Sequence, residues 1–249
     1  MQETAQAVIR ELFNSRVDNS LLLDDFNLFD SSVSQKLWSA EYNLGKLISL
    51  DVNEFRVFPS GGDTISFGAI TTGYKVLDII YYCRTLNLLL DGFFMNSMST
   101  LDTLAHELFT LYCCSDIPSN IYINTVRKML GGFHPSSKTL ELLNEQLRQG
   151  GWFTEFEPFR HCTTHVSLIR YNDIEVRFDQ LKNSYHLIKE IKLPDNPQTR
   201  PFTYDLNRSA AEYCQSMLIR IQSLVTDIYD RVLLDIHKNN DVLPIPSVK

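Results

Sequence analysis

The longest helical pattern in this chain is VLDIIYYCRTLNLLLDGFFMNSMSTLDTLAHELFTLYCC, residues 76–114. Its apolar positions recur every three or four residues, at Val76, Ile79, Ile80, Cys83, Leu86, Leu90, Phe93, Met98, Leu101, Leu104, Ala105, Leu108 and Tyr112. This period is typical of one buried face of an α-helix and predicts helix from Thr72 to about Cys114. Because helices of this length are uncommon, we expect a kink or break, most readily at Asp91-Gly92.

The same stretch is not expected to cross a membrane. Its most apolar part, residues 76–95, includes Asp78, Arg84, Asn87 and Asp91, and charged groups are costly inside a bilayer. The first ten residues lack the apolar centre of a signal peptide. We therefore predict a buried helix in a protein that has no membrane segment.

Composition indicates an ordinary globular protein of the cytoplasm. The chain has 249 residues, 44% of them hydrophobic and 21% charged, so it can bury a sizeable core. Its net charge of −7 argues against a broad surface that binds nucleic acid, although it still allows a local basic groove. The five cysteines are scattered without CxxC spacing, so neither a disulfide framework nor a zinc ribbon is indicated. A reducing compartment fits this pattern best.

Further helices are predicted on both sides of the long pattern. Ser31 or Ser32 is the expected N-cap of one, and Asp205 is the expected N-cap of a long final helix. Glycine pairs at 131–132 and 150–151 are expected to end two shorter helices. The predicted helices span residues 5–13, 33–48, 121–130, 136–148, about 156–171 and 206–232.

Two β-hairpins are predicted beside the helices. Residues 56–58 and 64–67 flank the glycine-rich turn SGGD at 60–63. Alternating apolar and charged residues at 174–178, followed by a strand-like run to residue 193, indicate a second hairpin that turns at 182–184. The sequence therefore predicts a mainly α fold with one or two small β-hairpin additions.

The densest chemical cluster is FEPFRHCTTH, residues 156–165. On a helix, Arg160 and His165 would lie roughly 140° apart around the axis and roughly 7.5 Å along it, a gap that a long arginine side chain can span. Arginine matches a phosphate group, and histidine can transfer protons near neutral pH. With Pro158 and Arg160 in the first helical turn, the helix N-terminus would add to anion binding. The pair suits RNA cleavage without a metal ion.

These residues resemble the catalytic motif of the HEPN superfamily, in which Arg is followed by a polar residue and, after four intervening positions, by His. STLDTLAHE at 99–107 is similar to the superfamily's long second helix, and LPDNP at 193–197, before a long helix, resembles the tail of one bacterial branch. The resemblance covers about residues 72–237. Ser167 stands where a well-known toxin branch has tyrosine, so modification of such a tyrosine by an antitoxin is not expected.

The resemblance implies an up-and-down helical bundle that dimerises and cuts RNA near the dimer interface. It implies Arg160 and His165 as catalytic residues, His161 as the polar neighbour of the arginine, and Asp102 as a partner from the second helix. It also implies a toxin or anti-phage defence role, with no metal or other cofactor and with an antitoxin or defence protein as a possible partner. The expected parts are residues 1–70 packed on the bundle, the bundle at 71–240, and a flexible tail at 241–249.

Other interpretations of the same residues stay open. Arg160 could form a structural salt bridge, and His165 could be a satisfied core histidine. His161 and His165 could ligate a metal ion, although no third ligand is evident. His106 is read as a polar neighbour of Asp102, and the aromatic residues at 152–159 as core rather than as a base-stacking surface. The alternative function is a catalytically inactive HEPN-like module that binds a partner protein or a nucleotide.

Overall fold

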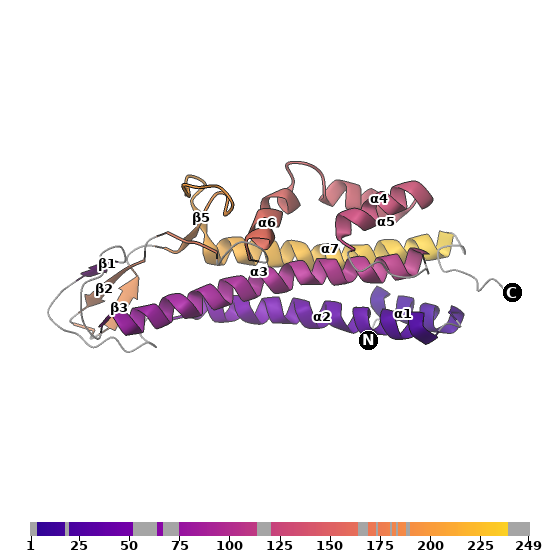
Figure 1. Ribbon diagram of the computed structural model, residues 1–249. Helices are drawn as coiled ribbons and strands as arrows, with labels where there is room; N and C mark the ends of the chain where they lie inside the picture. The colour runs from indigo at the N-terminus through magenta and orange to yellow at the C-terminus, as the bar shows by residue number, and fades with distance from the viewer. Residues whose placement is uncertain are drawn as a thin grey trace. The chain divides into compact units, whose positions relative to one another are not determined.

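The computed structural model describes residues 4–17, 20–51, 64–66, 75–113, 121–163, 169–172, 174–179, 181–182, 184–187 and 190–238. The predicted mainly helical fold is confirmed (Figure 1). The helices of this part of the chain are α1 (Ala5–Arg16), α2 (Ser20–Ile48), α3 (Lys75–Cys113), α4 (Ile123–Phe133), α5 (Lys138–Gln146), α6 (Trp152–His161) and α7 (Ala210–Lys238). None of the described helices is both long and apolar enough to span a membrane.

The chain divides into two compact units that draw on separate stretches of sequence. Unit 1 consists of Met1–Trp38, Asn96–Phe156 and Met217–Lys249. Unit 2 consists of Ser39–Met95 and Glu157–Ser216. Helices α2, α3, α6 and α7 contribute residues to both units. The division into residues 1–70, 71–240 and 241–249 stays a prediction, and the tail lies outside the described residues.

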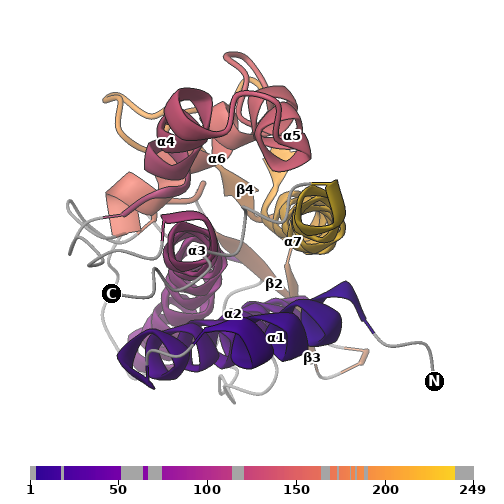
Figure 2. The same ribbon diagram turned by 90° about the vertical axis from the view of Figure 1, so that its right-hand side faces the viewer.

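Unit 1 is a helical bundle in which α1 and parts of α2, α3 and α7 lie side by side (Figure 2). Phe13 of α1 packs on Phe26 of α2, with ring centroids 4.3 Å apart. The predicted N-caps Ser31 and Ser32 are wrong, because α2 begins at Ser20 and both serines lie inside it. The helix extends this far because Phe26, Asp30 and Val33 continue one buried face, on which Asp30 interrupts the apolar pattern.

The hairpin of α4 and α5 is attached to α7 through one carboxylate. Asp235 accepts hydrogen bonds from the Ser137 hydroxyl (2.6 Å), the Tyr112 hydroxyl (2.7 Å) and the backbone amides of Lys138 (2.6 Å) and Thr139 (3.1 Å). The two amides belong to the first turn of α5, where backbone N–H groups lack partners within the helix. Asp235 therefore satisfies the N-terminus of α5, which begins at Lys138 rather than at the predicted residue 136. Helix α4 also runs on through its glycine pair to Phe133.

Helix α3 is continuous over its 39 residues, so the expected break at Asp91-Gly92 is wrong. In unit 2, a Cβ added at Gly92 would lie 2.9 Å from Oδ1 of Asn43 in α2. Real Cβ atoms do not approach other atoms so closely, so any larger residue at position 92 would require the Asn43 side chain to move. Packing along the length of α3 offsets the low helix propensity of glycine.

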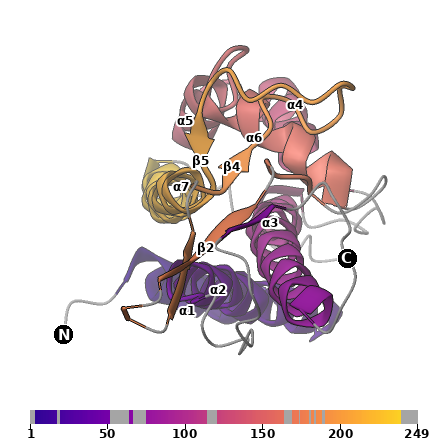
Figure 3. The same ribbon diagram turned by 90° about the vertical axis from the view of Figure 1, so that its left-hand side faces the viewer.

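Two small sheets in unit 2 contain the strands (Figure 3). The second predicted hairpin is confirmed, because β2 (Glu175–Asp179) and β3 (Ser184–Leu187) pair antiparallel with Val176 opposite Leu187. The first sheet is completed by β1 (Thr64–Ser66), which pairs antiparallel with β2. The predicted pairing of this strand with residues 56–58 stays a prediction. Residues 56–58 and the turn 60–63 lie outside the described residues. The second sheet pairs β4 (Lys192–Leu193) with β5 (Arg208–Ser209).

Helix α7 begins at Ala210, so Asp205 is not its N-cap. The Ser209 hydroxyl accepts from the Glu212 amide at 3.4 Å and takes that role. The segment before it stays out of the helix because Asp195 accepts hydrogen bonds from the backbone amides of Asp205 and Leu206, both at 2.9 Å. Tertiary hydrogen bonds from the LPDNP loop thus set the start of the helix.

Candidate functional site

Arg160 and His161 lie in the last turn of α6, at its end in unit 2. The preceding Phe159 is fully buried and stacks on Phe94 of α3, with centroids 4.9 Å apart. Tyr213 of α7 packs on Phe159 at 5.4 Å. These rings fix the backbone at the end of α6, while Arg160 is half-buried and His161 is exposed.

The predicted helix over residues 156–171 is wrong at both ends. It begins earlier, because Phe153, Phe156 and Phe159 repeat every three residues and are all buried, as the core interpretation of this aromatic run predicted. It ends earlier, because residues 169–172 are not helical. The Ile169 amide donates to Asp91 at 3.2 Å and the Tyr171 hydroxyl to the Cys83 carbonyl at 3.4 Å, so α3 holds this segment.

The corrected bounds change the expected electrostatics of Arg160. Pro158 and Arg160 lie near the C-terminal end of α6 rather than in its first turn, so the helix N-terminus does not add to anion binding there. A cation in a last turn is instead favoured by the helix dipole. His165 lies outside the described residues, so its pairing with Arg160 and its alignment with His161 stay predictions.

Asp102, the predicted partner from the second helix, is half-buried on α3 within unit 1. The Asp102 carboxylate lies close enough to Lys36 of α2 to affect the pKa of the lysine. Burial lowers the pKa of Lys36, and the Asp102 carboxylate counteracts part of that shift. Lys36 also donates to the Thr103 hydroxyl at 2.6 Å. Since Arg160 belongs to unit 2, the meeting of Asp102 with the arginine stays a prediction.

His106 lies one turn beyond Asp102 on the same helix. Its ring stacks on Phe29 at 5.2 Å, and its Nδ1 atom is buried without a hydrogen-bond partner. Burial lowers the pKa of His106, and the positive charge of Lys36 lowers it further. His106 is therefore a neutral imidazole near pH 7. Within the described residues, no three His, Cys, Asp or Glu side chains gather where they could hold a metal ion.

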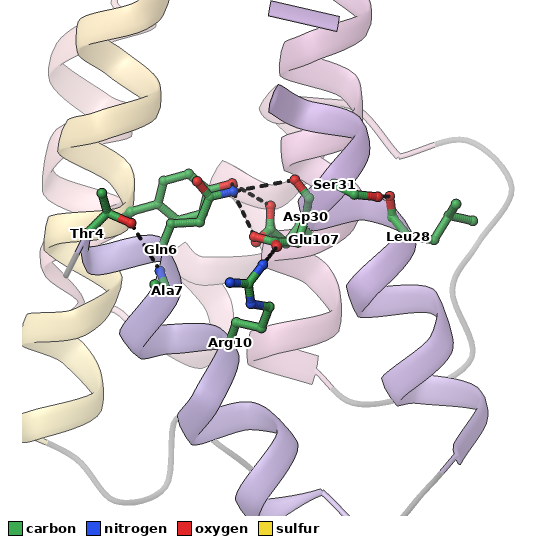
Figure 4. Close-up of polar contacts among 9 residues, drawn as sticks. Thr4, Gln6, Ala7, Arg10, Leu28, Asp30, Ser31 and Glu107 are labelled. Atoms are coloured by element: carbon green, nitrogen blue, oxygen red, sulfur yellow. Dashed lines mark hydrogen bonds and ion pairs between the residues drawn. The ribbon is translucent and has the colours of Figure 1, made fainter. Parts of the chain in front are cut away.

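Sequence reasoning missed a partly buried polar cluster in unit 1, built by α1, α2, α3 and α7 (Figure 4). We call it the Glu107 cluster; its members are Gln6, Arg10, Asp30, Glu107 and Tyr229. Gln6 donates to Asp30 Oδ1 (2.7 Å) and to the Tyr229 oxygen (3.3 Å). Arg10 pairs with Asp30 Oδ2 at 3.2 Å, and the Tyr229 hydroxyl donates to Glu107 Oε2 at 2.8 Å.

Glu107 is the unusual member of this cluster. It is 0% exposed, and its Oε1 atom has no hydrogen-bond partner. Burial raises the pKa of Glu107 to about 8, the hydrogen bond from Tyr229 counteracts part of the shift, and the nearby Asp30 raises it further. Glu107 is therefore mostly protonated at pH 7, and burial of a neutral acid costs far less than burial of a carboxylate.

A groove of about 720 Å³ adjoins the cluster within unit 1. Its walls come from the start of α1, from α2 and from the later part of α7. Gln6 and Tyr229 belong to both the groove and the Glu107 cluster. The lining residues are Thr4, Ala5, Gln6, Val33, Ser34, Leu37, Gln222, Val225, Thr226, Tyr229 and Asp230.

The sequence carried a weak signal for this site. Asp30 lies between the buried residues Phe26 and Val33, and Glu107 lies between the buried residues Leu104 and Leu111. Each acid therefore falls on the buried, otherwise apolar face of its helix. Acids on an apolar helix face indicate a buried polar contact. The signal does not say which helices meet, because the partners lie up to 223 residues apart.

Comparisons with known proteins leave the chain without an assigned family. No family model matches it, and neither a curated protein nor a solved structure is significantly similar.

Proposed function

We propose that this chain is a metal-independent endoribonuclease of HEPN type that acts in the cytoplasm as a homodimer. A role as a toxin or in anti-phage defence, under the control of an antitoxin or defence protein, belongs to the same proposal. The observation that carries it is the end of α6, where buried aromatic rings hold the backbone while Arg160 and His161 reach solvent. The mainly helical fold is consistent with it.

The proposed chemistry needs a cation and a proton carrier at one phosphodiester. Arg160 would stabilise the negative charge that develops on the phosphorane, as a forked donor fixed by the rigid end of its helix. His165 would take the proton of the 2′-hydroxyl or give one to the leaving 5′-oxygen. His161 would serve as the polar neighbour, and Asp102 as the acid that orients the site. No step in this scheme requires a metal ion.

Cleavage of total RNA in EDTA tests the proposal. Purified wild-type protein should degrade RNA near neutral pH, and His165→Ala should reduce the rate about 100-fold or more, the usual contribution of a proton carrier. Arg160→Gln should cause a comparable loss. His237→Ala and Arg231→Gln, which change exposed residues of α7, are matched controls and should cleave like wild type.

Two outcomes would defeat the nuclease. One is equal cleavage by the wild type and by His165→Ala, which would indicate a contaminating enzyme. The other is that wild-type protein does not cleave total RNA, while His165→Ala and Arg160→Gln bind RNA as well as the wild type does.

The rival is an inactive HEPN-like module that binds a partner protein or a nucleotide. The described groove does not favour a nucleotide, because none of its lining residues is Lys, Arg or His. Equilibrium binding of labelled ATP and GTP separates the two proposals: tight binding without RNA cleavage would favour the module.

A further inference from the structure

The loop between β4 and β5 in unit 2, residues 194–207, has no part in the proposed chemistry, yet many hydrogen bonds hold it in shape. The Asp195 amide donates to the Thr203 carbonyl at 2.8 Å, and the Thr203 hydroxyl donates to Asp195 Oδ2 at 2.7 Å. The Asp195 carboxylate also accepts from the backbone amides of Asp205 and Leu206. Compact surface loops fastened in this way frequently bind ligands. We call this segment the 194–207 loop.

Two arginines of this part of the chain lie over aromatic rings. In the middle of the loop, the guanidinium carbon of Arg200 lies 5.6 Å from the centre of the Phe202 ring. At its base, the guanidinium carbon of Arg208 lies 5.3 Å from the centre of the Tyr213 ring. Arg200 is exposed and Phe202 is half-buried, so this pair lies at the surface rather than in the core. Cations combined with aromatic rings are typical of surfaces that bind single-stranded nucleic acid.

The base of the loop is connected to the end of α6 by side-chain contacts. Tyr213, which lies under Arg208, packs on Phe159 at 5.4 Å, and Phe159 immediately precedes Arg160. Strands β4 and β5 lie beside α6 (Figure 1, Figure 3). Arg208 and Arg160 therefore share one aromatic support, and a strand bound at Arg160 can continue onto the loop.

The charges of the loop depend on where its acids point. Basic residues outnumber acids by three to two from β4 through β5, in a chain whose net charge is −7. Asp195 directs its carboxylate into the loop, where the hydrogen bond from Thr203 holds its pKa below the ordinary value. Asp205 in the loop, Glu157 in α6 and Glu212 in α7 are exposed. A polyanion would therefore be guided by the positions of the arginines rather than by a broad positive surface.

We propose that the 194–207 loop binds single-stranded RNA next to Arg160, with a base stacked on Phe202 and phosphates contacted by Arg200 and Arg208. Duplex RNA does not suit this surface, because its bases are stacked on one another and offer no free face to a ring. An acidic peptide has phosphate-like charge but no bases to stack. The choice of RNA as the ligand rests on the proposed nuclease function, whereas the geometry of the loop does not.

Fluorescence anisotropy with a labelled 2′-O-methyl oligouridylate tests the loop in the full chain. This strand cannot be cut by attack of a 2′-hydroxyl, so binding is measured apart from cleavage. A strand of about 12 nucleotides covers the usual size of such sites. Phe202→Ala should weaken binding about tenfold, the usual contribution of one stacked base, and Phe202→Trp should restore it.

The dependence of binding on salt separates the arginine from the ring. Arg200→Ala should weaken binding about fivefold and reduce the slope of log Kd against log salt by about 0.7, as expected for one phosphate contact on a single strand. Phe202→Ala should leave the slope nearly unchanged, because a stacked ring carries no charge. Asp205→Asn should strengthen binding, since it removes an exposed negative charge from the loop. An RNA duplex of equal length should not respond to Phe202→Ala.

Matched controls come from unit 1. Arg220→Ala and Phe133→Ala remove an exposed arginine and an exposed phenylalanine far from the loop in sequence, and both variants should bind like wild type. Arg200 and Phe202 are not core residues, so their variants should keep the fold, as circular dichroism will verify.

Two results would overturn the proposal. The first is a wild-type protein that binds no single strand, or one whose binding is unchanged by Phe202→Ala and Arg200→Ala. The second is an equal effect of Phe202→Ala on single strand and duplex, which would indicate general attraction to RNA. Cleavage of total RNA in EDTA is read separately. If the loop variants lose binding while wild type leaves RNA intact, the loop proposal holds and the nuclease fails; cleavage with unchanged binding gives the reverse.

Discussion

Two carboxyl groups buried in the same unit have opposite surroundings. Asp235 on α7 receives four hydrogen bonds, including one from the Tyr112 hydroxyl. Glu107 on α3 receives one, from the Tyr229 hydroxyl, and leaves its other oxygen without a partner. Burial alone would raise the pKa of Asp235, but its hydrogen bonds hold it below the ordinary value, whereas the pKa of Glu107 rises to about 8.

The difference shows which buried acid is held as a carboxylate and which keeps its proton. Donors around Asp235 satisfy the charged form, so the carboxylate is part of the structure and caps α5. Around Glu107 the donors are too few to hold a charge, so the acid keeps its proton.

The largest effect is expected from Asp235→Ala. The change leaves the Tyr112 and Ser137 hydroxyls and two backbone amides without their acceptor, and unpaired buried donors cost roughly 1–3 kcal/mol each before relaxation. We expect a loss of about 4 kcal/mol in the free energy of unfolding, measured by urea denaturation. Asp230→Ala, an exposed acid on the same helix, should change it by less than about 0.5 kcal/mol. Equal losses in Asp235→Ala and Asp230→Ala would show that the hydrogen bonds to Asp235 do not stabilise the fold.

The next effect is a pH dependence due to Glu107. Between its ordinary pKa of 4.5 and about 8, the folded state holds a proton that the unfolded chain has lost. Stability from this group is therefore full below pH 4.5 and falls as pH rises, by about 1.4 kcal/mol per pH unit until the folded pKa is reached. We expect wild-type protein to lose about 3 kcal/mol more than Glu107→Gln between pH 5 and 7.5. Parallel pH profiles of the two proteins would contradict this.

The smallest effect concerns the two tyrosines, which form a matched pair. Tyr112→Phe removes one of four donors from a charged acceptor and should cost about 1.5 kcal/mol at pH 7. Tyr229→Phe removes a donor from a protonated acid and should cost about 1 kcal/mol. Because the Tyr229 hydrogen bond lowers the pKa of Glu107, the second variant should also shift the loss of stability to higher pH. If the loss of stability shifted to lower pH instead, the Tyr229 hydrogen bond would not lower the pKa of Glu107.

Local patterns were enough to find the helices but not their ends. The period from Val76 to Tyr112 predicts α3 because a buried helical face leaves its spacing in the sequence. The ends of α6 and α7 could not be predicted, because they depend on hydrogen bonds with remote segments, such as the one that the Ile169 amide donates to Asp91. Gly92 was misread for a similar reason: Asn43, its close neighbour, is 49 positions away in the chain.

The candidate sites divide in the same way. By itself the sequence determined the mainly helical fold, the β2–β3 hairpin and the aromatic core of α6, because each rests on the spacing of nearby residues. It also supplied the Arg160–His165 motif, whose chemistry follows from residue type. Only the tertiary structure decided that Gln6, Asp30, Glu107 and Tyr229 meet beside a groove and that one buried oxygen has no hydrogen-bond partner. Burial and hydrogen-bond partners are properties of packed helices, and a linear pattern does not contain them.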